Sequence, residues 1–240
     1  MSSLVLTVAD TEAYRVNGYC FVDNALAPTQ LEALRTDFAA WVDESRAHTE
    51  PYGQTPDGRS RFDLEVDHAP ERPALRRVAS PVDVSDAYLE VMRDNRALDA
   101  VTQLIGPNVV PGSHRGPLFD HWHDGVYTGT VSPEVEAAHG ADALSVQGPA
   151  GSACLMHTRL LHGSAPNRSS QPRTLFISEY RAEDSKALQV NHLPSIHDGE
   201  VVRGERTNRV RCSTYEMEYP EVPTGASFFS QQAKADGLSV

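Results

Sequence analysis

The chain has 240 residues, which fits one domain with an added helical layer, and 40% of its residues are hydrophobic, as in an ordinary soluble protein. Its formal net charge is −12 and no block of Lys and Arg stands out, which argues against nucleic acid or an anionic membrane as the main partner. Its three cysteines are widely spaced and form no Cys-x-x-Cys pair, which argues against a zinc ribbon or a dithiol redox site and favours a reducing compartment.

Targeting and membrane segments are not indicated by the sequence. The first ten residues have no basic region followed by a long apolar stretch, as a secretory signal would have. No window approaches the roughly 18 consecutive apolar residues that a membrane span needs. We therefore expect a cytoplasmic protein that does not bind a membrane.

The first hundred residues are predicted to be mainly helical. Apolar side chains recur there at helical spacing, and the predicted helix ends carry the residues that helix ends favour: an Asn-Gly stop, a Pro at a first turn and a Ser cap. A stretch rich in Pro, Gly, Asp and Arg is predicted to be a loop. The predicted elements are helices at 11–17, 28–42 and 85–104, a strand at 19–24, and the loop at 50–73.

The remainder of the chain is predicted to be mainly β-structure. Its short apolar runs partly alternate with polar residues and are separated by turn residues, which suits a β-sandwich or a small barrel. A helical layer packed on a β-core follows from this order of elements. The predicted strands are 109–114, 144–147, 153–157, 175–180 and 212–217, with a short helix at 133–139.

The most informative segment is residues 157–167, HTRLLHGSAPN, with Arg173 shortly after it. His162 lies where an apolar run opens into a turn at Gly163, and the imidazole of a residue in such a place can hold a borderline metal ion. If the strand that begins near Arg173 pairs with residues 153–161, the Arg173 guanidinium returns close to His162 and can grip a carboxylate. Ser164 can donate a hydrogen bond to the same carboxylate. Taken alone, each is more often structural: a packed His, a surface Arg and a Ser bonded to nearby backbone.

Two further groups of potential ligands are less favoured. In a strand, His157 and His162 would point to opposite faces because an odd number separates them, so we interpret His157 as a supporting residue. Residues 120–124, DHWHD, hold the right atoms for a metal, but the adjoining Gly125 and Pro117 mark them as a loop, where His and Asp are commonly solvated.

Other enzyme classes are not indicated. The sequence has no Gly-x-Ser-x-Gly elbow, no Gly-x-Gly-x-x-Gly and no P-loop, which disfavours an α/β-hydrolase or a nucleotide-binding protein.

Several of these segments, taken together, resemble the phytanoyl-CoA dioxygenase family. The resemblance runs unevenly from about Tyr14 to Tyr219, and its most specific block runs from His157 to Arg173. The segments that carry it are residues 17–22 (NGYCFV), 111–118 (PGSHRGPL), 123–125 (HDG), 157–167 and Arg173.

This resemblance implies a mainly β protein with added helices, in which a double-stranded β-helix of jelly-roll or cupin type packs against N-terminal helices. It implies one domain over 1–240, with a helix-rich part at 1–108, a β-core at 109–220 and a tail at 221–240. It also implies an Fe(II)- and 2-oxoglutarate-dependent dioxygenase that hydroxylates a small organic molecule. By position, His162 matches a metal ligand, Arg173 the arginine that binds 2-oxoglutarate, and Ser164 a hydroxyl beside that carboxylate.

The sequence departs from the family at the other two metal ligands. The family carries a His-x-Asp on a strand upstream of the Pro-Gly-Ser-His turn, whereas no His-x-Asp occurs here and residues 105–110 run directly into Pro111. Three explanations stay open: a short form of an oxygenase, a sequence that omits a stretch, or an iron-free relative. Three functions also stay open: a dioxygenase, a non-catalytic small-molecule-binding protein on the same scaffold, and a metal-free structural domain. Loops on a rigid scaffold commonly carry specificity, so the segments 50–73 and 192–208 are predicted to cover the substrate. Oligomeric state is also left open.

Overall fold

The computed structural model describes residues 5–105, 119–124, 126–142, 144–163, 167, 169, 173–188, 191 and 193–212. They divide into two compact units. The first contains described residues within 1–113, 148–158 and 166–212, and the second contains those within 114–147 and 159–165. The organisation into one domain of the jelly-roll type stays a prediction.

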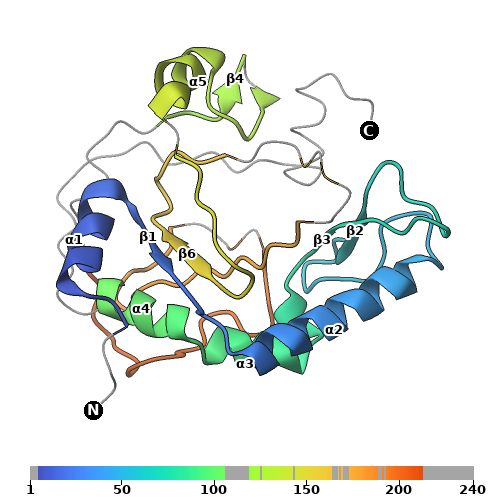
Figure 1. The fold of residues 1–240 in the computed structure, drawn as a ribbon, viewed down its shortest axis with the longest axis horizontal. Helices are drawn as coiled ribbons and strands as arrows, with labels where there is room; N and C mark the ends of the chain where they lie inside the picture. The colour runs from blue at the N-terminus through green and yellow to red at the C-terminus, as the bar shows by residue number, and fades with distance from the viewer. Residues whose placement is uncertain are drawn as a thin grey trace. The chain divides into compact units, whose positions relative to one another are not determined.

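Helices of the first unit begin and end at local signals in the sequence. Helix α1 begins one residue after Thr7, whose hydroxyl accepts a hydrogen bond from the Asp10 amide at 3.1 Å while the Asp10 carboxylate accepts one from the Thr7 amide at 2.8 Å. It ends before Gly18, which has the left-handed φ of 79°. The α-helices among the described residues of this unit are α1 (Val8–Asn17), α2 (Pro28–Ser45), α3 (Asp86–Arg93) and α4 (Arg96–Ile105) (Figure 1). The predicted helix at 28–42 is confirmed by α2.

The prediction of one long helix at 85–104 is wrong, because the helix is interrupted between α3 and α4. Ser85 caps α3 as predicted, by accepting a hydrogen bond from the Tyr88 amide at 3.1 Å. At Asp94 the backbone is extended, with φ −148° and ψ 103°. The Asn95 side chain then accepts a hydrogen bond from the Leu98 amide at 2.7 Å and so starts α4. Asn is a strong helix-capping residue, and here its side chain satisfies an amide that a continuous helix would have paired with backbone.

Strand β1 (Tyr19–Val22) pairs antiparallel with β6 (Ala153–Met156), with Tyr19 opposite Met156 and Val22 opposite Ala153. This confirms the predicted strands near 19–24 and 153–157. A second pair, β2 (Phe62–Leu64) with β3 (Leu75–Val78), lies partly inside the segment predicted to be loop, and a 3₁₀ turn, η1 (Pro81–Asp83), follows it. The prediction of a loop throughout 50–73 is therefore wrong at β2.

The second unit is small. It contains the two-residue strands β4 (Trp122–His123) and β5 (Val126–Tyr127), which pair antiparallel. Helix α5 (Pro133–His139) and the 3₁₀ turn η2 (Gly140–Asp142) follow, and α5 confirms the predicted short helix. Residues 144–147 and 175–180 were predicted as strands, but neither belongs to a ladder in the described part of the chain. The predicted strand 109–114 and most of 212–217 lie outside the described residues, as does the predicted tail.

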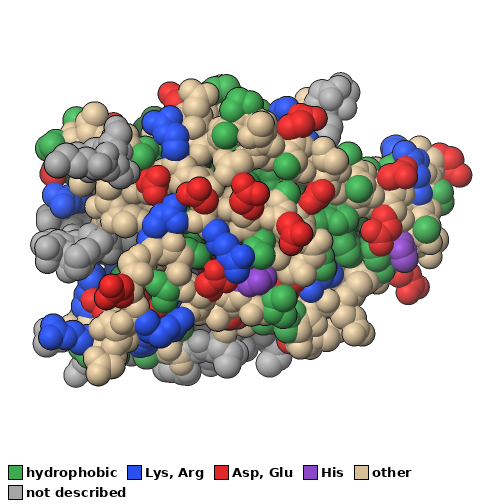
Figure 2. Space-filling model, turned by 90° about the horizontal axis from the view of Figure 1, so that it is seen from below, with side chains coloured by type: hydrophobic (Ala, Val, Ile, Leu, Met, Phe, Trp, Pro, Cys, Tyr) green, Lys and Arg blue, Asp and Glu red, His purple; other side chains and the backbone are tan. Residues whose placement is uncertain are grey.

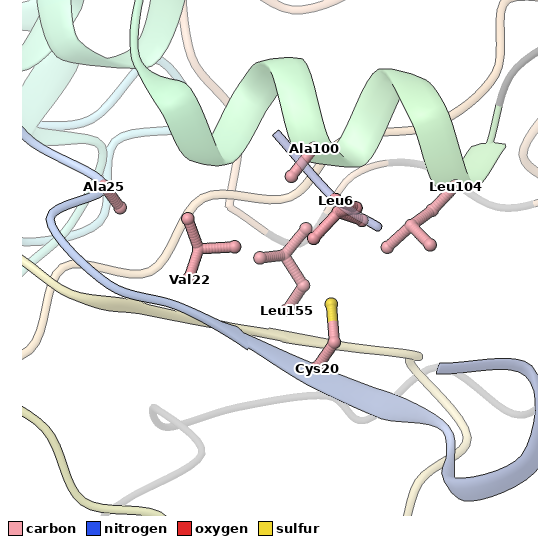
Figure 3. Packing of buried hydrophobic residues seen from close by; sticks show 7 residues of the cluster. All are labelled: Leu6, Cys20, Val22, Ala25, Ala100, Leu104 and Leu155. Atoms are coloured by element: carbon pink, nitrogen blue, oxygen red, sulfur yellow. The ribbon is translucent and has the colours of Figure 1, made fainter. Parts of the chain in front are cut away.

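Two hydrophobic clusters hold the first unit together. In one, β1 and β6 present side chains of one face to α4, so that Cys20 and Leu155 lie under Ala100 and Leu104 (Figure 3). Ala100 is fully buried, and its small side chain allows helix and strands to approach closely. In the other cluster Trp41 of α2 contacts Phe62 and Tyr88 at ring-centroid distances of 6.0 and 5.0 Å.

A buried ion pair, Arg61 with Asp83, connects the loop before β2 to the turn η1. The guanidinium of Arg61 lies 3.3 Å from the Asp83 carboxylate, and both side chains are almost fully buried. The same guanidinium donates hydrogen bonds to the carbonyl oxygens of Gln54, Ala79 and Ser80. The pairing satisfies groups that would be costly to bury alone.

The surface on the side of α2, α3 and α4 mixes charges of both signs. Figure 2 shows acidic and basic side chains interspersed there, with hydrophobic side chains between them. A strongly basic patch would be needed to hold nucleic acid, and this face does not display one. Among the described helices, none is both long enough and apolar enough to cross a bilayer.

Replacing Arg61 by Ala is expected to lower the free energy of unfolding by about 3–5 kcal/mol, because the substitution leaves the Asp83 carboxylate buried without its cation. Arg72→Ala is the matched control, since its ion pair with Asp67 has side chains 72% and 66% exposed. The control should cost less than about 1 kcal/mol. Urea unfolding followed by circular dichroism measures both. Equal losses for the two variants would contradict the assigned role of Arg61.

The three cysteines are expected to react with a thiol reagent in an order set by burial. Burial raises the pKa of Cys20 to about 11 and also raises the pKa of Cys154, whereas Cys212 is exposed. At about pH 8 the Cys20 thiol is therefore almost entirely protonated, and the thiolate is the reactive form. Mass spectrometry after brief alkylation should find Cys212 modified first and Cys20 modified only after unfolding. Early modification of Cys20 would show that the cluster of β1, β6 and α4 is not formed.

Candidate functional site

The segment that contains His162 leaves the sheet earlier than the sequence suggested. Strand β6 ends at Met156, and the His157 amide still donates a hydrogen bond to the Gly18 carbonyl at 2.9 Å. The chain then turns at residues 158–160. Only a continuous strand would place His157 and His162 on opposite faces, and β6 ends before both residues.

His162 is exposed and is oriented by its own backbone. Its Nδ1 lies 2.9 Å from the Leu160 carbonyl oxygen. A carbonyl only accepts hydrogen bonds, so Nδ1 must carry the proton and a neutral ring then has its lone pair on Nε2. Metal-binding histidines commonly make this contact, since it fixes the tautomer and aims the other nitrogen at the metal. His162 thus has the features of a single metal ligand.

Arg173 is exposed in the first unit, and no ion pair or hydrogen bond joins its guanidinium to the described part of the chain. It therefore has the planar pair of N–H donors that binds a carboxylate in bidentate geometry. Strand β6 pairs with β1, so the predicted pairing of residues 153–161 with the segment after Arg173 is not formed in the described residues. His162 belongs to the second unit, and the common cavity of His162 and Arg173 stays a prediction. Ser164 lies outside the described residues.

The cluster at 120–124 lies on the β4–β5 hairpin rather than in a simple loop, and its polar groups make local contacts. Asp120 accepts a hydrogen bond from the Trp122 amide at 3.0 Å. His123 Nε2 lies 3.0 Å from the Thr130 carbonyl oxygen, and Asp124 takes the left-handed φ of 52°. These contacts shape the hairpin, so the prediction of a loop is wrong at β4.

An Fe(II) centre of this family type needs two imidazoles and one carboxylate on one face of the metal. Among the described residues, no group of three His, Cys, Asp or Glu side chains is close enough to hold a metal ion. His162 is a suitable single ligand, but the described residues do not bring it two partners. The described residues therefore do not fit Fe(II) by themselves.

Two segments predicted to cover a substrate, 50–73 and 192–208, meet at one carboxylate that sequence reasoning did not single out. Asp83 binds Arg61 of the first segment. Its other oxygen accepts hydrogen bonds from the Ser195 hydroxyl at 2.5 Å and the Ile196 amide at 3.2 Å. The sequence gives no signal that Asp83 joins these two segments, because Arg61, Ser195 and Ile196 are all distant from it in the chain.

The second covering segment is also held to the helices by exposed and half-exposed ion pairs. The Glu200 carboxylate binds Arg93 of α3 through two contacts of 2.6 and 2.7 Å. Arg203 binds Asp94 at 2.8 Å. The segment is thus tied to the helices along its described length.

The neutral imidazole of His162 is expected to be the Nδ1–H tautomer. Two-dimensional ¹⁵N–¹H correlation of the ring, at a pH where it is uncharged, distinguishes the two nitrogens by their shifts, and His162→Ala assigns the signals. The hydrogen bond to the Leu160 carbonyl predicts a protonated Nδ1. A predominantly Nε2–H ring would contradict the orientation described above.

Comparison with known proteins agrees with the sequence resemblance. Residues 95–175 match the family model of phytanoyl-CoA dioxygenase (PhyH). Over 85 residues the chain is 35% identical to a protein of Stutzerimonas stutzeri named "Probable alpha-ketoglutarate-dependent hypophosphite dioxygenase". That alignment covers 33% of this chain and 29% of the relative, so the chain spans under a third of the relative's length. No solved structure matches the chain. The segment from residue 95 to residue 175, which includes His162 and Arg173, is thus similar to the phytanoyl-CoA dioxygenase family.

Proposed function

We propose that the chain is an oxygenase of the Fe(II)- and 2-oxoglutarate-dependent type that acts on a small molecule. The observation that carries this proposal is the family match over residues 95–175, because it contains His162, Ser164 and Arg173 in the order and spacing of the resemblance. The relative from Stutzerimonas stutzeri, whose name states dependence on alpha-ketoglutarate, supports the same cosubstrate.

Arg173 would bind the cosubstrate. Its exposed guanidinium has no ion pair within the described residues, so it does not have to leave a protein carboxylate in order to bind a ligand. A bidentate contact with the distal carboxylate of 2-oxoglutarate uses both donors of its planar fork. Ser164 would add a hydrogen bond to that carboxylate, as the resemblance implies.

His162 would be a metal ligand through Nε2. When bound, Fe(II) supplies the redox chemistry of this family, and the protein's part is to hold the metal with neighbouring positions open. His162 needs two further ligands, which the described residues do not bring to it.

The exposed guanidinium of Arg173, which has no ion pair among the described residues, favours a second candidate function. This function is that of a non-catalytic protein that binds a small carboxylic acid. An Arg173 site needs no metal to hold a carboxylate, and it would persist if the metal ligands were lost. The two candidates share Arg173 and differ at His162.

The substrate is proposed only as a small molecule. A small organic compound fits the resemblance. A small oxyanion is the alternative, since the name of the relative specifies hypophosphite. Product analysis with each class, in the presence of 2-oxoglutarate, distinguishes them.

Substituting Arg173 by Ala is expected to weaken 2-oxoglutarate binding by about 10- to 100-fold, which is the effect of losing a charged hydrogen-bonding pair. Isothermal titration under anaerobic conditions with Fe(II) measures this affinity, and succinate formation in air measures turnover. Arg209→Ala, which removes another exposed arginine of the first unit, is the control and should bind normally.

The variant His162→Ala separates the candidates. Loss of Fe(II) binding and of succinate formation supports the oxygenase, whereas unchanged 2-oxoglutarate binding with no turnover in either protein supports the binding function. If neither His162→Ala nor Arg173→Ala affects any ligand, both candidates fail and a metal-free structural domain remains.

A further inference from the structure

The segment after Arg173 has one face packed on helix α3 and one face open. From Leu175 to Arg181 exposed and half-buried residues alternate strictly, which is the period of an extended strand. Phe176 contacts the ring of Tyr88 edge-on at 5.0 Å, and the Tyr180 hydroxyl donates a hydrogen bond to the Met92 carbonyl at 2.8 Å. One row of side chains therefore fixes the segment to α3.

The other row carries large apolar side chains to solvent. Leu175 is 74% exposed and Ile177 is 72% exposed. No backbone hydrogen bond joins residues 173–180 to any other segment that the structure describes. A strand with this composition and an unpaired edge is a template for pairing with another strand.

The sequence of this segment is complementary to itself when reversed. In an antiparallel pair of two copies centred on Phe176, Leu175 of one copy faces Ile177 of the other, and Thr174 faces Ser178. At the ends, Arg173 faces Glu179. The pairs thus join two aliphatic side chains, two hydroxyl side chains and two opposite charges. Cross-strand pairs of these kinds stabilise sheets.

We propose that residues 173–179 form an antiparallel, two-fold symmetric strand pair with the same segment of a second copy of this chain. The two-fold axis lies midway between the two copies of Phe176 and makes the interface isologous, so both copies use the same surface. Leu175 and Ile177 of the two copies then cover one another on the outer face, while Phe176 stays against α3 in each copy. Arg173 is available for the ionic pair, because it has no ion-pair partner among the described residues.

A second copy accounts for this surface better than an unspecified strand does. A generic partner would need only apolar residues opposite Leu175 and Ile177. The placement of Arg173 and Glu179 at equal distances from Phe176, with opposite charges, is what a two-fold pair requires. A parallel in-register pair would instead place each charge against its own kind, which is unfavourable.

The charges allow a test in which two variants associate only with each other. Arg173→Glu places glutamates opposite each other in a self-pair, and Glu179→Arg places arginines opposite each other. Mixed, the two variants restore opposite charges at both ends. We expect the wild-type chain to dimerise, each variant alone to dimerise at least about tenfold more weakly, and the equimolar mixture to recover the wild-type affinity. Sedimentation velocity from about 1 µM to about 1 mM, the range of weak interfaces, measures this.

Arg181→Glu is the matched control. It reverses a charge on the same segment just beyond the paired residues and should leave association unchanged. Leu175→Thr is an uncharged second test, since it keeps strand propensity while it removes the apolar contact, and it should weaken dimerisation. Circular dichroism checks that the variants fold, which we expect because residues 173, 175, 179 and 181 are all exposed.

The experiment is run with chelator and without 2-oxoglutarate, so its failure leaves the proposed function unaffected. A wild-type chain that stays monomeric throughout the range overturns the proposal. A dimer that withstands both charge reversals, or variants that do not associate when mixed, also overturns it, because either result places the interface or its register elsewhere.

Discussion

The ladder between β1 and β6 is the interaction on which the first unit depends. It joins the start of the chain to Ala153–Met156, and its inner face supplies Cys20, Val22 and Leu155 to the cluster under α4. Because side chains alternate along a strand, a shift of one residue in this register would turn that apolar face toward water. The register therefore fixes where β6 ends, and with it the point at which the chain turns off toward His162.

The Asp83 carboxylate joins two loop segments of the first unit in a similar way. It accepts hydrogen bonds from two segments that are far apart in the sequence and would otherwise depend on their own weak propensities. Because Asp83 is buried, the loss of one of these contacts would be costly in free energy, since a carboxylate removed from water must be fully paired. The two segments are thereby joined to the turn η1, while most of their described residues are exposed or half-buried.

Sequence reasoning predicted the helices better than the strands for a physical reason. Helix ends are set by neighbours, as Pro28 at the start of α2 and Ser85 at the start of α3 illustrate, and even the error at Asn95 is a local capping effect. Strands need a distant partner, so the pairing of β6 with β1 in place of residues 174–180 was not readable from pattern. The candidate site has the same limitation. The chemistry of His162 and Arg173 could be predicted from residue type and spacing, but a ligand set depends on which distant segments meet.

Arg173 is the residue at which the proposed ligand site and the proposed strand pair meet. A guanidinium that binds Glu179 of a second copy has fewer donors left for the carboxylate of a 2-oxo acid, and the reverse holds equally. Thermodynamic linkage then requires that ligand binding weaken pairing by the same factor by which pairing weakens ligand binding. The factor is limited by the exposed ionic pair alone, because Leu175 and Ile177 hold the strands together whether or not Arg173 takes part. Coupling between the two would therefore be modest, although both proposals use the Arg173 guanidinium.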